Sequence, residues 1–545
     1  MSQLLSDFRI AARTLSTQRR FTILAVLTLA LGLSFTTAFF SIFDTILLRP
    51  LNYADSESLV AVLQPGRSPT APGNFVDLKA GASSLEAMTA ATPWRPVMRG
   101  QGPPEQLAAL RSTPGLFDLL GVEPLIGRTY QPDGRSLGED GPRVLVMGYA
   151  LWQTRFGGDA AIVGRALELD GESFTVIGIM PEGFEFPPFW ATGAELWAPF
   201  TAGREFWTER DTNSLRVFAR LAEETEIAAA QKEVDRIAAA LQAEYPDDNA
   251  TLSYRVEAMS EPVVEGIRPA LQTILLGVGL VLLIACANVT SLWLTRTATR
   301  AQELAVRRAL GARGWSLWRQ GLAESLCVMV LAVGLGWQLA LWGLEAVKTL
   351  APPGVPRLQE AALDGRIFAF TASVGLILTL GFSCFLPLLI GGEKKARLAA
   401  AARRLGNRGE SRGRSWLVTG EIAMALMLLL ASGLMAKSLL NLWRTDSGLR
   451  DQGVLTAELP FGGSEVAAPE QQSAFFDRLI AQAESVPGVE SAALINHLHL
   501  GGDIWTTRVQ VEGQPVDSSA RAPSASFKVV SEGLFETFGI ELLEG

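Results

Sequence analysis

The feature that most constrains this chain is a set of five apolar stretches, each long enough to cross a lipid bilayer. A membrane-spanning helix needs about 20 mainly apolar residues, because the hydrocarbon core is about 30 Å thick. We place the spans at residues 21–48, 271–294, 322–347, 367–390 and 416–440. A hydrophobic content of 48% over 545 residues agrees with a membrane protein that also carries soluble parts.

Lysine and arginine are concentrated in the short connections between these stretches. Such connections stay on the cytoplasmic side of bacterial membranes. We therefore predict that residues 1–20, 296–319 and 391–415 are cytoplasmic, and that residues 51–266 and 441–545 lie outside. Residues 1–20 mix apolar and arginine side chains at helical spacing. This pattern predicts an interfacial amphipathic helix, and a plain basic leader to the first span is equally open.

The long segment 51–266 has the pattern of a mixed α+β domain. Asp170-Gly171 supplies the turn of a predicted hairpin between two alternating apolar strands. Further along, we expect a strand at 215–221, a helix at 227–241 and a strand at 252–259. The strand–helix–strand order predicts an α+β or split-βαβ module.

The second soluble segment repeats part of the first. The run PGLFDLLGVEPLIG from Pro114 and the run EGLFETFGIELLEG from Glu532 are identical at seven of fourteen positions. We therefore expect residues 441–545 to form a second, incomplete copy of the first soluble domain.

The Arg-rich segment 296–319 lies between the second and third spans. An arginine at the bilayer centre costs roughly 2.5–3.5 kcal/mol, so we place this segment in a cytoplasmic loop. Read as a helix, it sets Glu303 and Arg307 at the favourable i,i+4 spacing, and Gly311 offers a C-cap. A soluble partner could dock on such a helix. The alternative is a solvated loop whose arginines only set the topology.

Sites of covalent, metal or nucleotide chemistry are not evident in the sequence. The three cysteines fall inside predicted spans, and the pair His497 and His499 has no cysteine nearby, so we read both as surface residues. The chain has no G-x-x-x-x-G-K-[ST] phosphate-binding loop and no hydrolase motif. We predict no catalytic residues, metal or cofactor, and the segregation of acids from bases argues against nucleic acid as a partner.

Three polar residues fall within or at the rims of the apolar stretches: Asn288, Glu324 and Glu421. Polar groups at membrane depth are costly and are functional candidates by default. The alternatives are a helix–helix hydrogen bond or a side chain that reaches to the interface.

The loop sequence RAQELAVRRALGA, followed by ARGWSLWRQGLAESL, resembles the FtsX-like permease family, which includes the macrolide exporter MacB. The first span and the passage from Arg143 to Pro187 resemble the same family, whose core domain lies outside the membrane. In this family the loop is a coupling helix that docks on a nucleotide-binding subunit. The resemblance assigns that role to Ala301, Glu303, Ala305, Arg307, Arg308, Ala309 and Gly311.

The resemblance implies a multi-domain membrane protein with an α-helical bundle of about five spans and large α+β extracytoplasmic domains of the MacB periplasmic-core type. The domains are then a cytoplasmic amphipathic helix (1–20), the first span (21–48), the MacB-like core domain (51–266) and the FtsX-like permease part (267–390). They are followed by a basic cytoplasmic loop (391–415), the fifth span (416–440) and a second, incomplete core domain (441–545). Since a duplicated permease of this family has three further spans after its second soluble domain, we expect the chain to be a fragment or a truncated product.

The function that follows from the resemblance is a permease subunit of a MacB-like ABC-type export or mechanotransmission system. It implies a bacterial inner-membrane protein with a cytoplasmic N-terminus, an ABC-type ATPase supplied in trans, and a possible homodimer or second permease. The alternative is an FtsX-like regulator of an envelope enzyme without transport. A membrane enzyme is a more distant reading, because no catalytic constellation is visible.

Overall fold

The protein folds into two compact units, which are described separately. The computed structural model describes residues 2–100, 103–131, 141–189, 193–299, 314–351, 355–390, 408–445, 448–450, 453–459, 469–496, 498, 506–508 and 524–541. The first unit comprises residues 1–49 and 264–444, and the second comprises residues 50–263 and 445–545.

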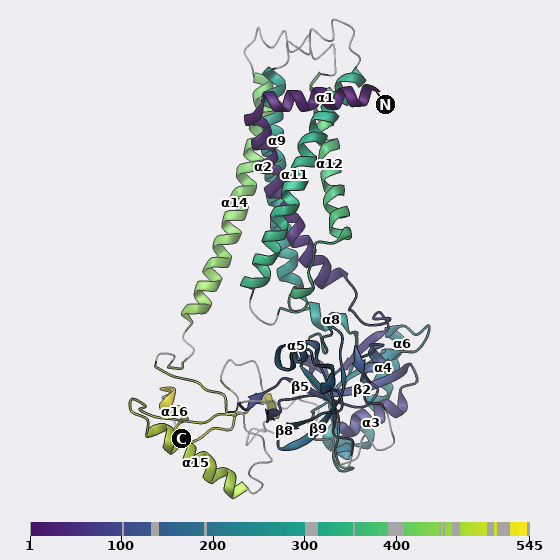
Figure 1. Cartoon of the computed structure of the whole chain (residues 1–545), viewed down its shortest axis with the longest axis vertical. Coiled ribbons are helices and arrows are strands. Elements are labelled where there is room, and N and C mark those ends of the chain that lie inside the picture. The colour runs from purple at the N-terminus through teal and green to yellow at the C-terminus, as the bar shows by residue number, and fades with distance from the viewer. Residues whose placement is uncertain are drawn as a thin grey trace. The chain divides into compact units, whose positions relative to one another are not determined.

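The first unit is a bundle of long helices (Figure 1). Its elements are α1 (Ser2–Thr17), α2 (Arg19–Phe43) with a π-helical end (Asp44–Leu48), α9 (Arg268–Thr299), α11 (Gly314–Leu350), a 3-10 turn (Leu358–Glu360), α12 (Gly365–Ile390) and α14 (Arg408–Arg444). Within the described residues, five helices are long and apolar enough to cross a membrane: 19–48, 268–296, 318–350, 365–383 and 418–444. Each overlaps one predicted span.

Helix α2 lies at the centre of this bundle and packs against α9, α11 and α12. Small residues allow the close approach that stabilises helix pairs in lipid. A Cβ added at Gly32 would lie 3.0 Å from the side chain of Ala285, and one at Gly336 would lie 3.0 Å from the carbonyl oxygen of Ala30.

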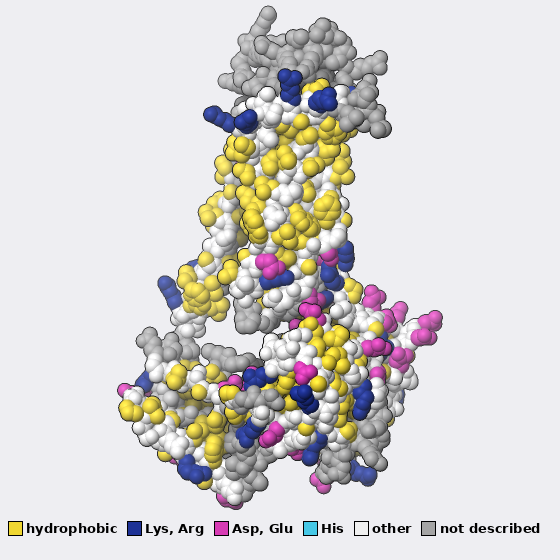
Figure 2. Space-filling view, viewed as in Figure 1, with side chains coloured by type: hydrophobic (Ala, Val, Ile, Leu, Met, Phe, Trp, Pro, Cys, Tyr) yellow, Lys and Arg dark blue, Asp and Glu magenta, His cyan; other side chains and the backbone are white. Residues whose placement is uncertain are grey.

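Helix α14 packs beside α9, and most of the apolar side chains of α14 are exposed. Apolar side chains cover the flank of the bundle (Figure 2), as expected of a surface that faces lipid.

The N-terminal helix α1 crosses one end of the bundle, almost at right angles to the spans (Figure 1). Its Ala11 and Leu15 are buried, whereas Phe8 and Ile10 are exposed. The helix therefore has one face packed on the bundle, mainly on α11, and one apolar edge left open. The segment is thus a helix that packs on the bundle, and its position at a membrane interface stays a prediction.

The second unit is built on one continuous mixed sheet. Its strands are β1 (Leu59–Leu63), β2 (Leu85–Trp94), β3 (Val97–Arg99), β4 (Glu105–Gln106), β5 (Ala109–Ser112), β6 (Ile126–Gly127), β7 (Val144–Met147), β8 (Ala166–Leu169), β9 (Glu172–Ile179), β10 (Leu196–Pro199), β11 (Arg216–Leu221) and β12 (Arg255–Ala258). Their order is β12-β1-β11-β2-β5-β10-β7-β9-β8-β3-β4, and β6 pairs with β9.

Helices cover the two halves of this sheet and enclose two separate cores. They are α3 (Pro72–Gly81), α4 (Leu116–Leu120), α5 (Tyr149–Phe156), α6 (Ile227–Glu244), α7 (Pro246–Asn249) and α8 (Ser260–Val264), with 3-10 turns at Pro65–Arg67, Ala160–Ile162 and Phe206–Thr208. Apolar residues of α3 and α6 pack on β1, β2, β11 and β12. Apolar residues of α5 pack on the half that contains β7, β8, β9 and β10.

The predicted strand–helix–strand module is present. Strands β11 and β12 both pair antiparallel with β1, which lies between them, and α6 connects them, so the unit is a split βαβ. The predicted hairpin is formed by β8 and β9. Its turn residues Asp170 and Gly171 have φ of 53° and 78°, the left-handed values that a tight two-residue turn needs.

The segment after residue 444 contains α15 (Pro469–Glu484), a pair of short strands β13 (Thr506–Arg508) and β14 (Ser524–Ser526), and α16 (Leu534–Thr537).

Hydrogen bonds beside the repeated sequence are the same in the first soluble segment and in this one. Thr113 exchanges a pair of bonds with Ala90: Ala90 N donates to Thr113 Oγ1 at 2.9 Å, and Thr113 N donates to Ala90 O at 2.8 Å. The aligned Ser531 exchanges the same pair with Leu494, at 2.9 and 3.0 Å.

The short helix that follows is also anchored in the same way in both copies. Ala54 N, just after the first span, donates to Leu120 O at 3.1 Å. Arg450 N, just after the fifth span, donates to Phe538 O, the aligned position, at 2.7 Å. The sequence repeat therefore corresponds to a repeat of backbone structure.

Candidate functional site

The loop between α9 and α11 is the segment to which the sequence assigned a docking role. Its residues Ala301, Glu303, Ala305, Arg307, Arg308, Ala309 and Gly311 lie outside the residues that the structure describes. The structure does describe the two helix ends that carry the loop, since α9 ends at Thr299 and α11 begins at Gly314. The candidate site is therefore the base of this loop.

Both ends of the predicted segment 296–319 are helical. Arg296 belongs to α9 and Arg319 belongs to α11. Each guanidinium meets a carboxylate, so each arginine has a counter-charge within the helical unit. The cytoplasmic position of the segment stays a prediction.

Arg296 forms a buried ion pair with Glu324 of α11. Arg296 Nη2 lies 2.9 Å from Glu324 Oε2, and the two side chains are 6% and 5% exposed. Gln320, one turn earlier on α11, directs its Nε2 to the other carboxylate oxygen at 3.4 Å. The pair thus joins α9 to α11 directly beside the loop.

Two aromatic rings enclose the guanidinium of Arg296. Its Cζ lies 4.6 Å from the ring centroid of Phe21 and 5.1 Å from that of Trp293. The two rings are 5.4 Å apart and nearly perpendicular. Cation–π attraction is strongest where water is excluded, so the rings add to the ion pair. Phe21 comes from α2, and the central span therefore takes part in the same cluster.

A second ion pair holds the other side of the loop. Arg319 Nε lies 2.5 Å from Asp7 Oδ2, with side chains 24% and 14% exposed. Asp7 belongs to α1, so this ion pair joins the amphipathic helix to α11 near the start of α11. We call Arg296, Glu324, Arg319 and Asp7 the loop-base cluster.

The loop-base cluster links helices through charged side chains that have little exposed surface. Removing one partner of a buried ion pair costs about 3–5 kcal/mol, because the other charge is left without compensation. The pairs therefore join α9 to α11 and α11 to α1, and the ring of Phe21 brings α2 into contact with Arg296.

The other two polar residues predicted in the spans, Asn288 and Glu421, are not members of the loop-base cluster. Asn288 is half-buried in α9, and Glu421 is half-buried in α14. Of the three candidates, Glu324 is the one with an ion-pair partner among the described contacts, which supports a helix–helix contact for it.

The described residues give no sign of metal chemistry. Cys286 and Cys327 are free thiols in α9 and α11, whereas His497 and His499 lie outside the described residues. The described residues contain no group of three His, Cys, Asp or Glu side chains that could hold a metal ion.

Two protein-family models match the chain. Residues 22–237 match the MacB-like periplasmic core domain. Residues 275–392 match the FtsX-like permease C-terminal domain, and this range contains Arg296, Arg319 and Glu324 but not Asp7. No curated protein matches the chain.

Several solved structures are similar to parts of the chain. A domain of a permease protein from Porphyromonas gingivalis is 16% identical, with a TM-score of 0.30, and the match covers 38% of this chain and 93% of that one. The extracellular domain of the noncanonical ABC-type transporter YknZ from Gram-positive bacteria is 18% identical, with a TM-score of 0.27 and coverages of 36% and 99%. The periplasmic region of MacB from Actinobacillus actinomycetemcomitans is 12% identical, with a TM-score of 0.29 and coverages of 41% and 97%.

Replacing Glu324 by glutamine should destabilise the helical unit, because Arg296 stays buried without a counter-charge. We expect a loss of about 3–5 kcal/mol, visible as a lower melting temperature of the purified protein in detergent. The double variant Arg296→Met with Glu324→Leu should recover much of this loss, since it removes both charges. Glu421→Gln, at a half-buried position on α14, serves as the control. A Glu324→Gln protein that melts like the wild type would show that the pair does not stabilise the bundle.

Proposed function

We propose, from the premise that this chain belongs to the MacB-type, FtsX-like family of ABC transporter permeases, that it converts ATP hydrolysis by a partner subunit into motion of its extracytoplasmic domains. The chain is a multi-pass membrane protein with a MacB-like core domain and an FtsX-like permease domain. In this proposal the segment 296–319 is the docking segment for the ATPase.

The observation that carries the proposal is the loop-base cluster. A loop that only set topology would need positive charge but no rigid base. Here the helix on each side of the loop is held by an ion pair with little exposed surface, Arg296 with Glu324 and Arg319 with Asp7. Such a base suits a loop that is pushed by a partner.

The energy source is proposed to be supplied in trans. The sequence contains no phosphate-binding loop of the G-x-x-x-x-G-K-[ST] type, so this chain does not provide that part of an ATPase. Membership of an ABC permease family makes an ABC-type ATPase the natural partner, and the small side chains of the loop would admit its surface closely.

The proposed orientation places residues 1–20, 296–319 and 391–415 in the cytoplasm. The soluble segments 51–266 and 441–545 are then extracytoplasmic domains, the second being the repeat of the first. The bias of lysine and arginine toward the short connections supports this assignment.

The single substitutions Ser173→Cys and Ser411→Cys should label from opposite sides of the membrane. The background would lack the three native cysteines, and a membrane-impermeant thiol reagent would be added to intact cells and to inverted vesicles. The Ser173→Cys protein should react in intact cells, and the Ser411→Cys protein should react in inverted vesicles. Labelling of both proteins in intact cells would contradict the orientation.

Replacing Ala305 by tryptophan should uncouple the ATPase. A bulky ring would exclude a closely fitting partner surface without touching the spans. Co-expressed with an ABC-type ATPase of the same genome, the variant should lose co-purification and stimulated ATP hydrolysis at equal membrane abundance. Glu303→Lys should act more weakly, because an exposed i,i+4 pair contributes only about 0.2–0.5 kcal/mol.

Wild-type coupling in Ala305→Trp would mean that the ATPase docks elsewhere or that the loop sets topology alone. Coupling to the ATPase without movement of any solute would instead favour the FtsX-like alternative, in which the extracytoplasmic domains control an envelope enzyme. Reconstituted vesicles that report solute efflux separate these two outcomes.

A further inference from the structure

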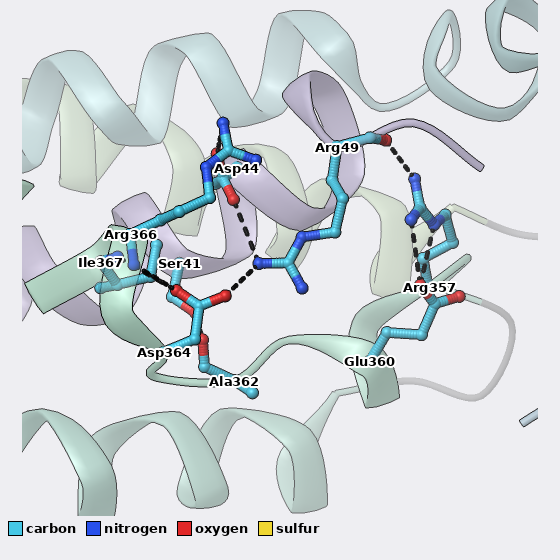
Figure 3. A network of polar contacts seen from close by, with 9 residues as sticks. All are labelled: Ser41, Asp44, Arg49, Arg357, Glu360, Ala362, Asp364, Arg366 and Ile367. Carbon is cyan, nitrogen blue, oxygen red and sulfur yellow. Dashed lines mark hydrogen bonds and ion pairs between the residues drawn. The ribbon is translucent and has the colours of Figure 1, made fainter. Parts of the chain in front are cut away.

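The two ends of the first span differ in how their arginines are neutralised. At one end, Arg49 lies between two carboxylates: its Nη2 donates to Asp364 Oδ2 at 2.6 Å and to Asp44 Oδ2 at 3.4 Å (Figure 3). Arg366 Nη2 lies 3.5 Å from the other oxygen of Asp44. Both arginines therefore have a counter-charge within the helical unit.

Arg357, in the turn before α12, is neutralised in the same way. Its Nη2 lies 3.0 Å from Glu360 Oε2, and its Nη1 donates to the carbonyl oxygen of Arg49 at 2.8 Å (Figure 3). Each of the arginines drawn in Figure 3 thus contacts a carboxylate of the same unit. The positive charges of this network are compensated inside the protein.

The opposite end of the first span carries arginines in a different setting. Arg9 and Arg13 of α1 and Arg20 at the start of α2 are exposed. Within the part of the chain that the structure describes, none of the three forms an ion pair. Asp7 is the one acidic residue among residues 1–20, and it pairs with Arg319. Figure 2 shows basic side chains at this end of the bundle.

Helical geometry separates the arginines of α1 from its packed face. Ala11 and Leu15 of this helix are buried. Because about 3.6 residues complete a turn, Arg9 and Arg13 lie one turn apart on the side almost opposite to Ala11 and Leu15. The two arginines therefore share the exposed side of α1.

Apolar side chains and the place of α1 in the chain point to lipid. Phe8 and Ile10, the neighbours of Arg9 in sequence, are 37% and 46% exposed. Helix α1 ends at Thr17, and the first apolar span begins at Arg19, so α1 directly precedes the span. Since α1 runs almost at right angles to the spans, it would lie along a bilayer surface (Figure 1). Exposed apolar and basic side chains on one helix are typical of membrane-surface binding.

Two tryptophans lie close to this helix on α11. Trp315 is 67% exposed and stacks on Trp318, with ring centroids 4.7 Å apart. Arg319, which pairs with Asp7 of α1, follows Trp318 directly, so both rings lie within about one turn of that ion pair. Tryptophan is enriched at membrane–water interfaces. The pair therefore suits the same headgroup layer as α1.

We propose that Arg9, Arg13 and Arg20 bind the phosphate groups of anionic phospholipids, and that these arginines form a lipid-binding surface with Phe8 and Ile10. Guanidinium groups and phosphates form charge-assisted hydrogen bonds, and lipid phosphates supply the counter-charges that this end of the span lacks among the described residues. The exposed apolar side chains favour lipid over an acidic protein surface. The inference goes beyond the proposed function and does not depend on an ATPase.

The test titrates the purified full chain in detergent with phosphatidylglycerol or phosphatidylcholine and measures bound lipid by native mass spectrometry. Each basic residue near an anionic bilayer surface strengthens binding about fivefold. Arg9→Gln, Arg13→Gln and Arg20→Gln together should lower the affinity for phosphatidylglycerol by about tenfold or more and leave that for phosphatidylcholine unchanged. Raising the salt from about 0.1 M to about 1 M should weaken wild-type binding, because the Debye length falls from about 10 Å to about 3 Å.

Two further triple variants separate local charge from folding and from net charge. Lysine at the same three positions keeps the charge, so this variant should bind phosphatidylglycerol within about threefold of the wild type. Arg143→Gln, Arg165→Gln and Arg255→Gln together remove the same charge from exposed side chains of the sheet unit and should leave lipid binding unchanged.

Several outcomes would overturn the inference. The first is equal affinity of the wild type and the triple glutamine variant of α1 for phosphatidylglycerol. A second is an equal loss in the sheet-unit control, because net charge would then set the affinity. Competition by excess glycerol 3-phosphate would show a site for soluble phosphate, since that molecule has no acyl chains. Tighter binding of a polyglutamate peptide than of phosphatidylglycerol at the same arginines would show a protein-docking surface instead.

Discussion

Charge neutralisation within the helical bundle is the constraint on which the rest of this structure depends. An arginine near the hydrocarbon either leaves the helix or finds a counter-charge, because a lone buried charge is costly. In this chain Arg296 meets Glu324 and Arg319 meets Asp7, so α9 and α11 continue as helices up to the loop. The same principle operates at the opposite end of the first span, where Arg49 lies between two carboxylates. The apolar middle of the bundle is thus closed at each end by paired charges.

The architecture was largely predictable from hydrophobic patterning. Five long apolar stretches are an unambiguous signal, since lipid leaves a chain few structures other than helices. The hairpin at Asp170-Gly171 and the βαβ order around α6 were also predictable, because turn residues and periodicity are local properties. The pairing of twelve strands into one sheet with two cores was not, because strand order depends on contacts between distant residues. The internal repeat predicted matching backbone structure, and Thr113 and Ser531 carry the same hydrogen bonds.

The candidate site was only half predictable. Glu324 stood out as an acid in an apolar run, for which the sequence left a functional role, a helix–helix hydrogen bond and a side chain reaching the interface open. Its partner Arg296 was assigned to the loop, because the sequence alone gives the cost of a buried arginine but not the identity of its counter-charge. Asp7 carried a weaker signal, as an acid within a basic amphipathic segment that faces α11. The aromatic rings around Arg296 come from two different helices, so no sequence motif joins them.

The proposed function implies one mechanical account, in which a docked ATPase displaces the segment 296–319 and the helical unit moves the α+β domain. Pulsed electron paramagnetic resonance tests this account most directly. Spin labels would replace Ser173 in the α+β domain and Trp342, which is 65% exposed, on α11, in a chain without its native cysteines and bound to the proposed ATPase. The account predicts that the distance distribution between the labels shifts when ATP and vanadate trap the complex, and that it returns when nucleotide is removed. Identical distributions in the trapped and nucleotide-free states would contradict it.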